Sequence, residues 1–165
     1  MKLTLRLVLL AAVIGLGFWL WTIFFPSPEK VVLKKISGLA AIATISANDS
    51  NLIRAAKAAN LAGFFAMDAQ IIVNVPDLPN RTLSGREEIQ ETALGGFANV
   101  KVLNVRFLDA NVRLGADKQT ADVDCTCEVN AGDKKDFGVQ ELRFQFKKAD
   151  GKWLITRVET VKTLL

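Results

Sequence analysis

The longest apolar segment of the chain lies near its start, where no charged residue occurs from Leu7 to Phe25. At about 1.5 Å of rise per residue, a helix of this length is roughly 28 Å long, which matches the hydrocarbon thickness of a bilayer. Basic residues precede the segment, aromatic residues crowd its end, and two prolines follow it. We therefore predict a basic N-terminal tail over residues 1–6, a transmembrane helix over 7–25 and a linker over 26–29.

The flanks of this segment indicate how it sits in the membrane. A cleaved signal peptide has a shorter apolar core and a small-x-small cleavage site, whereas two tryptophans and two phenylalanines end this segment. We expect it to remain in the mature protein as a single-pass signal anchor. Lys2 and Arg6 favour a cytoplasmic N-terminus, even though Lys30, Lys34 and Lys35 lie beyond the other end. We therefore place the soluble domain on the extracytoplasmic side of the membrane.

The rest of the chain shows two hydrophobic periods. Apolar residues at three- and four-residue spacing predict helices over 28–44, 52–63 and 85–98. In the second of these helices, the period places Arg54 and Lys57 on the outer face and turns the apolar positions inward, namely Leu52, Ile53, Ala56, Ala59 and Gly63. Alternating patterns bounded by turn residues predict strands over 64–75, 100–108, 119–130, 137–148 and 153–164.

This order of elements predicts a single α+β domain over residues 30–165. Two helices come first, followed by a strand, a short helix and a run of strands linked by short turns. Such an order favours a curved antiparallel sheet that wraps around the N-terminal helices. The length of the segment is close to the commonest size for one domain with its own core.

The composition excludes several classes of function. The chain contains no histidine and no tyrosine. Ser-His-Asp and Cys-His catalytic arrangements therefore cannot form. A structural zinc site needs four nitrogen or sulfur ligands, and Cys125 and Cys127 are the only soft ligands present. We predict neither a cofactor nor a metal site.

The charge of the chain does not indicate nucleic-acid binding. The formal net charge is +4, but residues 29–165 contain 19 basic and 17 acidic residues once Lys2 and Arg6 are set aside. These charges are interleaved along the sequence, as in residues 133–136, and form no continuous basic stretch. Because binding to a phosphate backbone depends on clustered positive charge, we predict no nucleic-acid partner.

Three short segments carry a resemblance to a known family. They are residues 61–66, which lead into the first strand, residues 84–89, which open the third helix, and residues 150–155, which enter the last strand. Together they resemble the nuclear transport factor 2-like superfamily, also called SnoaL-like or cystatin-like, over roughly residues 30–163. The resemblance implies a cone-shaped fold. It implies little about function, because this fold hosts isomerases, dehydratases, transport adaptors and secretion-system subunits.

The resemblance also allows a test for catalytic residues. The ketosteroid isomerases of this superfamily pair an aspartate base just before a proline with a tyrosine oxyanion donor. Here Val75 precedes Pro76, and no tyrosine is present. A protonated carboxyl group could still polarise a carbonyl in an apolar site, so Asp68, Asp109 and Glu159 stay open as candidates. We assign no catalytic residue.

One group of residues is predicted to line a ligand pocket. Strand alternation puts Arg157 and Glu159 on the same face as Trp153 and Ile155. If that face lines the concavity, two charges enter an apolar pocket and must pair or bind a ligand. We therefore predict Arg157, Glu159 and Trp153 as the ligand-binding residues. The alternative is a structural ion pair at the mouth of the pocket.

The two cysteines lie two residues apart on a predicted strand. Alternation points Cys125 and Cys127 into the core together. Their Cα atoms would be about 7 Å apart, which is too far for an unstrained disulfide. We expect them to act as small buried hydrophobic residues. A redox pair would require a bulge at this point.

These observations favour a membrane-tethered, non-catalytic module that binds a partner protein or a small apolar ligand. The lipid bilayer is its other partner, through residues 7–25. Two alternatives stay open. One is an isomerase- or lyase-type enzyme that uses a lone pocket carboxylate, and the other is a structural subunit of a larger membrane complex.

Overall fold

The computed structural model describes residue 15 and residues 27–74, 80–132 and 137–161. The predicted transmembrane helix lies outside these ranges, except for Gly15, and so does the residue pair Val75 and Pro76. Among the described residues, no helix is both long enough and apolar enough to cross a bilayer.

The described residues form helices and strands in the order that the sequence predicts, with one addition. The helices are α2 (Pro28–Ala43), α3 (Asn51–Ala62) and α4 (Arg86–Asn99). The strands are β1 (Phe65–Val73), β2 (Arg81–Ser84), β3 (Leu103–Leu114), β4 (Thr120–Ala131), β5 (Phe137–Ala149) and β6 (Lys152–Thr160). The added element is β2, whose four residues are too short to show an alternating pattern.

Serine side chains begin the first two of these helices. The hydroxyl of Ser27 accepts a hydrogen bond from the backbone N–H of Lys30, and Pro28 fills the first helical position of α2. Ser50 caps α3 in the same way by accepting from the N–H of Ile53. These contacts satisfy backbone donors that have no partner within the helix. Both helices therefore begin where local sequence chemistry favours a start.

The six strands form one sheet in the order β2-β1-β6-β5-β4-β3. Neighbouring strands are antiparallel, except that β1 and β6 are parallel. The predicted all-antiparallel sheet is therefore corrected at this pair. The reason is topological, because the last strand of the chain returns beside the first one and runs in the same direction.

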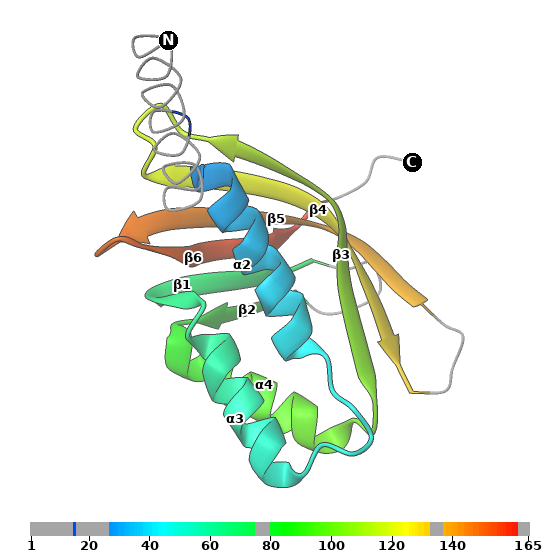
Figure 1. The fold of residues 1–165 in the computed structure, drawn as a ribbon. Helices are drawn as coiled ribbons and strands as arrows, with labels where there is room; N and C mark the ends of the chain where they lie inside the picture. The colour runs from blue at the N-terminus through cyan, green and yellow to red at the C-terminus, as the bar shows by residue number, and fades with distance from the viewer. Residues whose placement is uncertain (1–14, 16–26, 75–79, 133–136, 162–165) are drawn as a thin grey trace, which may run out of the picture.

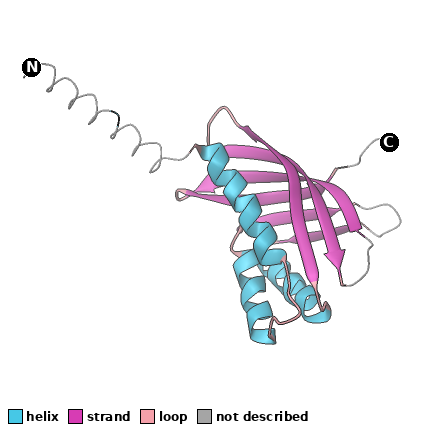
Figure 2. Ribbon diagram, turned by 45° about the vertical axis from the view of Figure 1, so that its right-hand side comes forward, coloured by secondary structure: helices cyan, strands magenta, loops and turns pink. Residues whose placement is uncertain are grey.

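The helices cover one face of the curved sheet. Figures 1 and 2 show α2 lying across this concave face, with α3 and α4 packed side by side next to β1 and β2. Val32, Ile36 and Leu39 of α2 are buried against residues of the sheet that include Phe144 and Trp153. No buried polar or charged side chain occurs in the described parts of the chain. The interior of the domain is thus an apolar core.

Helices α3 and α4 are joined by an arginine that the helical period places on the surface. Arg54 of α3 is half-buried and donates hydrogen bonds to the carbonyl oxygens of Phe97, Val100 and Lys101, at the end of α4. The predicted outward position of Arg54 is therefore wrong, and so is the predicted inward position of Leu52, which is 81% exposed. The last carbonyls of a helix lack partners within it, and a guanidinium fork can satisfy several of them at once.

Candidate functional site

Strand β6 does not keep a single alternation along its length. Ile155 lies opposite Phe146, whereas Arg157 lies opposite Gln145, so Thr156 is an extra residue in β6. Such a bulge reverses which face the following side chains occupy. Val158 is therefore buried in the core, and Arg157 and Glu159 lie on the opposite, outer face.

This bulge contradicts the shared face from which the ligand site was predicted, whereas ligand binding by Arg157, Glu159 and Trp153 stays a prediction. Trp153 is 3% exposed and belongs to the core on the concave face, so it does not share a face with Arg157 and Glu159. The Nε of Arg157 donates to Oε2 of Glu159 at 3.0 Å, which confirms that the two charges pair. Their side chains are 39% and 27% exposed, so the pair is open to solvent. The structure thus separates the tryptophan from the two charged residues.

On the outer face, the pair continues into a chain of charges that crosses four strands. We call it the outer-face ladder, and it contains Arg113, Asp124, Arg143, Glu159 and Arg157. Asp124 is 2.6 Å from Nη1 of Arg113 and 2.7 Å from Nε of Arg143. Arg143 lies directly opposite Glu159 on β6. Opposite charges on facing strands stabilise a sheet, because their side chains meet on one surface.

The ladder changes the proton affinity of its central members. Partial burial acts to raise the pKa of Asp124, but hydrogen bonds and charges from Arg143 and Arg113 outweigh it and lower that pKa. The hydrogen bond and charge of Asp124, and more weakly the charge of Glu159, raise the pKa of Arg143. Both effects keep the ladder charged at neutral pH.

A hollow of about 300 Å³ lies beside the ladder on the outer face. Six of its nine lining residues are polar or charged, namely Asp109, Asn111, Asp124, Thr126, Glu141 and Arg143. It forms where β3 bulges, because Asp109 and Ala110 together oppose Cys125. Asp109 there has a φ of 53°, a left-handed conformation that is uncommon for a residue with a side chain.

Two carboxylates in this outer-face hollow have no basic partner within the described ranges. These are Asp109 and Glu141, whereas Asp124 is held by two arginines. The hydroxyl of Thr126 and the amide of Asn111 add further hydrogen-bonding groups. No group of acidic, cysteine or histidine side chains among the described residues has the arrangement of a metal site. The hollow therefore offers hydrogen-bonding groups and negative charge to a positively charged group.

The carboxylates considered for acid-base chemistry all lie outside the core. Asp68 and Asp109 are exposed, and Glu159 is ion-paired on the outer face. A carboxyl group that stays protonated at neutral pH needs an apolar environment. None of these three acids has one in this structure.

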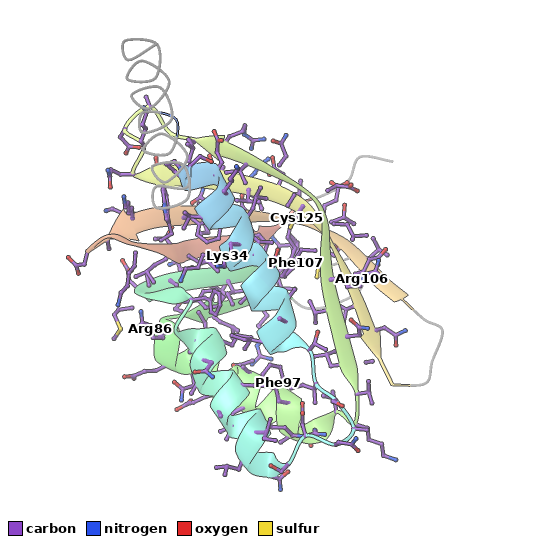
Figure 3. All side chains as sticks on the ribbon, viewed as in Figure 1. Lys34, Arg86, Phe97, Arg106, Phe107 and Cys125 are labelled. Atoms are coloured by element: carbon purple, nitrogen blue, oxygen red, sulfur yellow. The ribbon has the colours of Figure 1, made fainter. Side chains whose placement is uncertain are left out.

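The two cysteines are free and buried, as the strand pattern predicts. They are 5% and 7% exposed, and Figure 3 shows Cys125 and Phe107 on the side of the sheet that α2 covers. Burial raises the pKa of Cys125 to about 12 and that of Cys127 to about 11, so neither forms a thiolate near neutral pH. The nearby bulge is in β3 and leaves the spacing of the cysteines on β4 intact.

Comparison with known families agrees with this architecture. Residues 45–159 match the family described as the SnoaL-like domain. The match covers more than half of the chain, so the protein belongs to this family. No curated protein matches its sequence.

Solved structures share the fold at low sequence identity. An NTF2-like protein with a cystatin-like fold from Novosphingobium aromaticivorans is 19% identical with a TM-score of 0.60, over 92% of this chain and 86% of that one. Aln2 from a Streptomyces species is 13% identical with a TM-score of 0.61, over 84% and 92%. A chain of the yeast Ubp3 deubiquitinase and Bre5 cofactor complex is 17% identical with a TM-score of 0.52, over 66% and 85%. These likenesses establish the fold alone.

Replacing Asp124 by asparagine should destabilise the protein in a pH-dependent way. The folded pKa of Asp124 is lowered, so its stabilisation is present above the ordinary unfolded value of about 3.9 and is lost as the pH falls through the folded value. Because the ladder is partly exposed, we expect a loss of only about 1 kcal/mol at pH 7. Urea titrations from pH 7 down to about pH 3 should show the unfolding free energies of the wild-type protein and the Asp124→Asn variant converging. A difference that stays constant with pH would contradict the role of the ladder.

Proposed function

We propose that this protein is a membrane-tethered, non-catalytic SnoaL-like domain that binds a protein partner through the outer face of its sheet. The observation that carries this proposal is the outer-face hollow, where Asp109 and Glu141, which have no basic partner among the described residues, lie beside the ladder of charges. Interfaces use such polar groups for orientation and partner choice. A partner segment that bears a lysine or arginine has the complementary charge.

The core supports a binding function over a catalytic one. The concave face is filled by large apolar side chains such as Phe144, Phe146 and Ile155, and no acid or base is buried among them in the described ranges. A ligand pocket usually combines an apolar cavity with a few converging polar groups. The outer-face hollow instead has charged residues of both signs in its lining, which favours a protein surface over a small apolar ligand. The yeast Ubp3 and Bre5 complex shows that this fold occurs in protein complexes.

The tether rests on the sequence of residues 7–25. Their length and lack of charge suit one crossing of a bilayer. The described domain begins at Ser27, two residues after the end of this segment. A domain tethered in this way meets partners that are confined to the same membrane, which raises their effective concentration.

Site-specific crosslinking tests the binding face. A photoreactive amino acid in place of Thr126, in the outer-face hollow, should give one discrete adduct in membranes. The same group in place of Gln90, on the exposed face of α4, is the matched control and should not give that adduct. Adding Glu141→Lys should abolish the adduct at position 126 by reversing the charge. An adduct of twice the protein's mass would identify the partner as a second copy. No adduct from position 126 would contradict the proposal.

The enzyme alternative makes a different prediction for Asp68 and Glu159, the two candidate acids that do not line the outer-face hollow. Replacing them one at a time by their amides should shift stability by about 1 kcal/mol or less and leave the cellular role intact. An acid-base enzyme would lose its function with one such change, because the proton donor or acceptor would be gone. Complementation of a deletion strain, with the melting temperature measured in parallel, separates the two outcomes. Loss of the phenotype at an unchanged melting temperature would favour an isomerase- or lyase-type enzyme.

A further inference from the structure

The first turns of α2 carry a basic surface that the core does not use. Lys30 and Lys34 are exposed and Lys35 is half-exposed, and Glu29 is the only acid of this helix. The Nζ of Lys35 lies 5.1 Å from the centre of the Phe64 ring. Beside them is an apolar groove of about 230 Å³, formed by Val31, Gly38 and Phe64 with Lys34 and Lys35 at its rim.

The fold brings two turns from distant parts of the sequence to the same end of the sheet. The backbone N–H of Lys148 donates to the carbonyl of Gln119 at 2.7 Å, which joins the β5–β6 turn to the β3–β4 turn. Figures 1 and 2 both show these turns at the end of the sheet where α2 begins. The turns and the residues next to them contribute Lys118, Lys147, Lys148 and Lys152.

These elements together form what we call the basic end. It holds seven lysines and three acids, Glu29, Asp117 and Asp150, whereas the rest of residues 29–165 holds twelve basic and fourteen acidic residues. None of the seven lysines is within ion-pair distance of an acid in the described ranges. Further along the sheet, Arg113 and Asp122 lie opposite each other. This pair adds one positive and one negative charge, so it leaves the net charge of this end unchanged. The nearly neutral domain therefore has its positive charge gathered at one end.

The basic end is also where the apolar segment joins the domain. Helix α2 begins at Pro28, three residues after the end of the predicted span at residue 25. Three extended residues reach about 10 Å, which is comparable to the thickness of one headgroup layer. A domain attached by so short a link must keep this end close to the membrane surface. Phosphate headgroups are the anionic chemistry present there.

We propose that the basic end docks on the anionic phospholipid headgroups of the membrane that anchors the protein. This inference rests on the proposed tether and deepens it, because docking would hold the domain in one orientation. Each lysine near an anionic surface adds to the attraction, which decays over a Debye length. The exposed side chain of Leu33 and the groove beside Phe64 can enter the boundary between headgroups and acyl chains. The outer-face hollow would then have a fixed position relative to the membrane.

The test uses the full chain reconstituted into nanodiscs. A fluorophore on Gln119→Cys, in the β3–β4 turn, reports proximity to lipids that carry an acceptor on the headgroup. A second fluorophore position, Leu52→Cys, is the control, because Leu52 is 81% exposed in the first turn of α3, and Figure 1 shows α3 beginning at the other end of the domain from the start of α2. The native cysteines are buried and have raised pKa values, which limits their labelling.

We expect energy transfer from position 119 to be greater in discs that contain phosphatidylglycerol than in discs of phosphatidylcholine alone. Raising the ionic strength from about 0.1 M to about 1 M shortens the Debye length from ~10 Å to ~3 Å and should remove most of this difference. The triple variant Lys118→Gln, Lys147→Gln, Lys152→Gln should lose it at low salt as well. A matched triple variant, Arg81→Gln, Lys101→Gln, Arg106→Gln, removes as much charge from the opposite end and should keep it.

The outcomes separate the docking from the tether. If alkaline carbonate releases the protein from membranes, the tether is wrong and the docking inference fails with it. If the protein resists extraction but energy transfer from position 119 changes with neither phosphatidylglycerol nor salt, the docking inference alone is wrong. If the two triple variants lost the phosphatidylglycerol effect equally, the docking inference would also be wrong, since the net charge of the protein would then explain the effect.

Discussion

Replacing Trp153 by alanine should lower the free energy of unfolding by about 3–5 kcal/mol. Trp153 is 3% exposed at the start of β6 and packs in the same core cluster as Val32, Phe146 and Ile155. Removing the indole takes away a large apolar surface and leaves a cavity that surrounding side chains fill only in part. The site is poorly able to collapse, because α2 covers it on one side and the sheet forms the other.

Denaturant titration of the full chain in mild detergent, followed by circular dichroism, measures this loss. Trp153→Phe should cost less than the alanine variant, because a ring still fills part of the space. Leu52→Ala is a matched apolar truncation at a residue that is 81% exposed, and it should change stability by no more than about 0.5 kcal/mol. If Trp153→Ala were as mild as Leu52→Ala, the tryptophan could not lie in the core as described.

Replacing Arg54 by alanine should cost about 2–3 kcal/mol, which is the second largest effect that we expect. Its guanidinium donates to the carbonyl oxygens of Phe97 and Val100 and, at 3.3 Å, to that of Lys101. Its Nε also donates to the carbonyl oxygen of Asp49 at 3.0 Å. Without Arg54, half-buried carbonyls at the end of α4 lose their donors, and the positive charge that favours a helix C-terminus is lost.

The conservative variant tests the geometry of this contact. Arg54→Lys keeps the charge but cannot reach several carbonyls in a fork, so it should recover only part of the lost stability. Hydrogen exchange should locate the damage in the last turn of α4 and around Phe97, which Figure 3 shows between α3 and α4. Arg106→Ala is the control, because that side chain is 62% exposed and its ion pair is 3.5 Å long. A lysine at position 54 that restores full stability would show that only charge matters there.

Much of the fold could be predicted from the order and period of apolar residues. The buried stripe of Val32, Ile36 and Leu39 follows the helical spacing, and the alternation around Cys125 and Cys127 places both cysteines inside. These predictions hold because burial of apolar side chains is the main driving force of folding and because each element has a fixed period.

The candidate site could not be predicted in the same way. An alternating pattern assigns residues to faces only while the register is unbroken, and one extra residue reverses every position beyond it. Thr156 is such a residue, and no glycine marks it in the sequence. The bulge at Asp109 is equally unmarked, although it opens the outer-face hollow. Both bulges depend on how neighbouring strands pair.

The sequence by itself determined the apolar segment at 7–25, the presence and order of the helices, the buried cysteines and the family resemblance, because each depends on neighbours along the chain. Tertiary structure alone decided the outer-face ladder, the contact of Arg54 with the end of α4, and the basic end. The lysines of the basic end are spread from residue 30 to residue 152, and along the chain they look like ordinary surface charge. They act together only because strand pairing places two distant turns beside the start of α2.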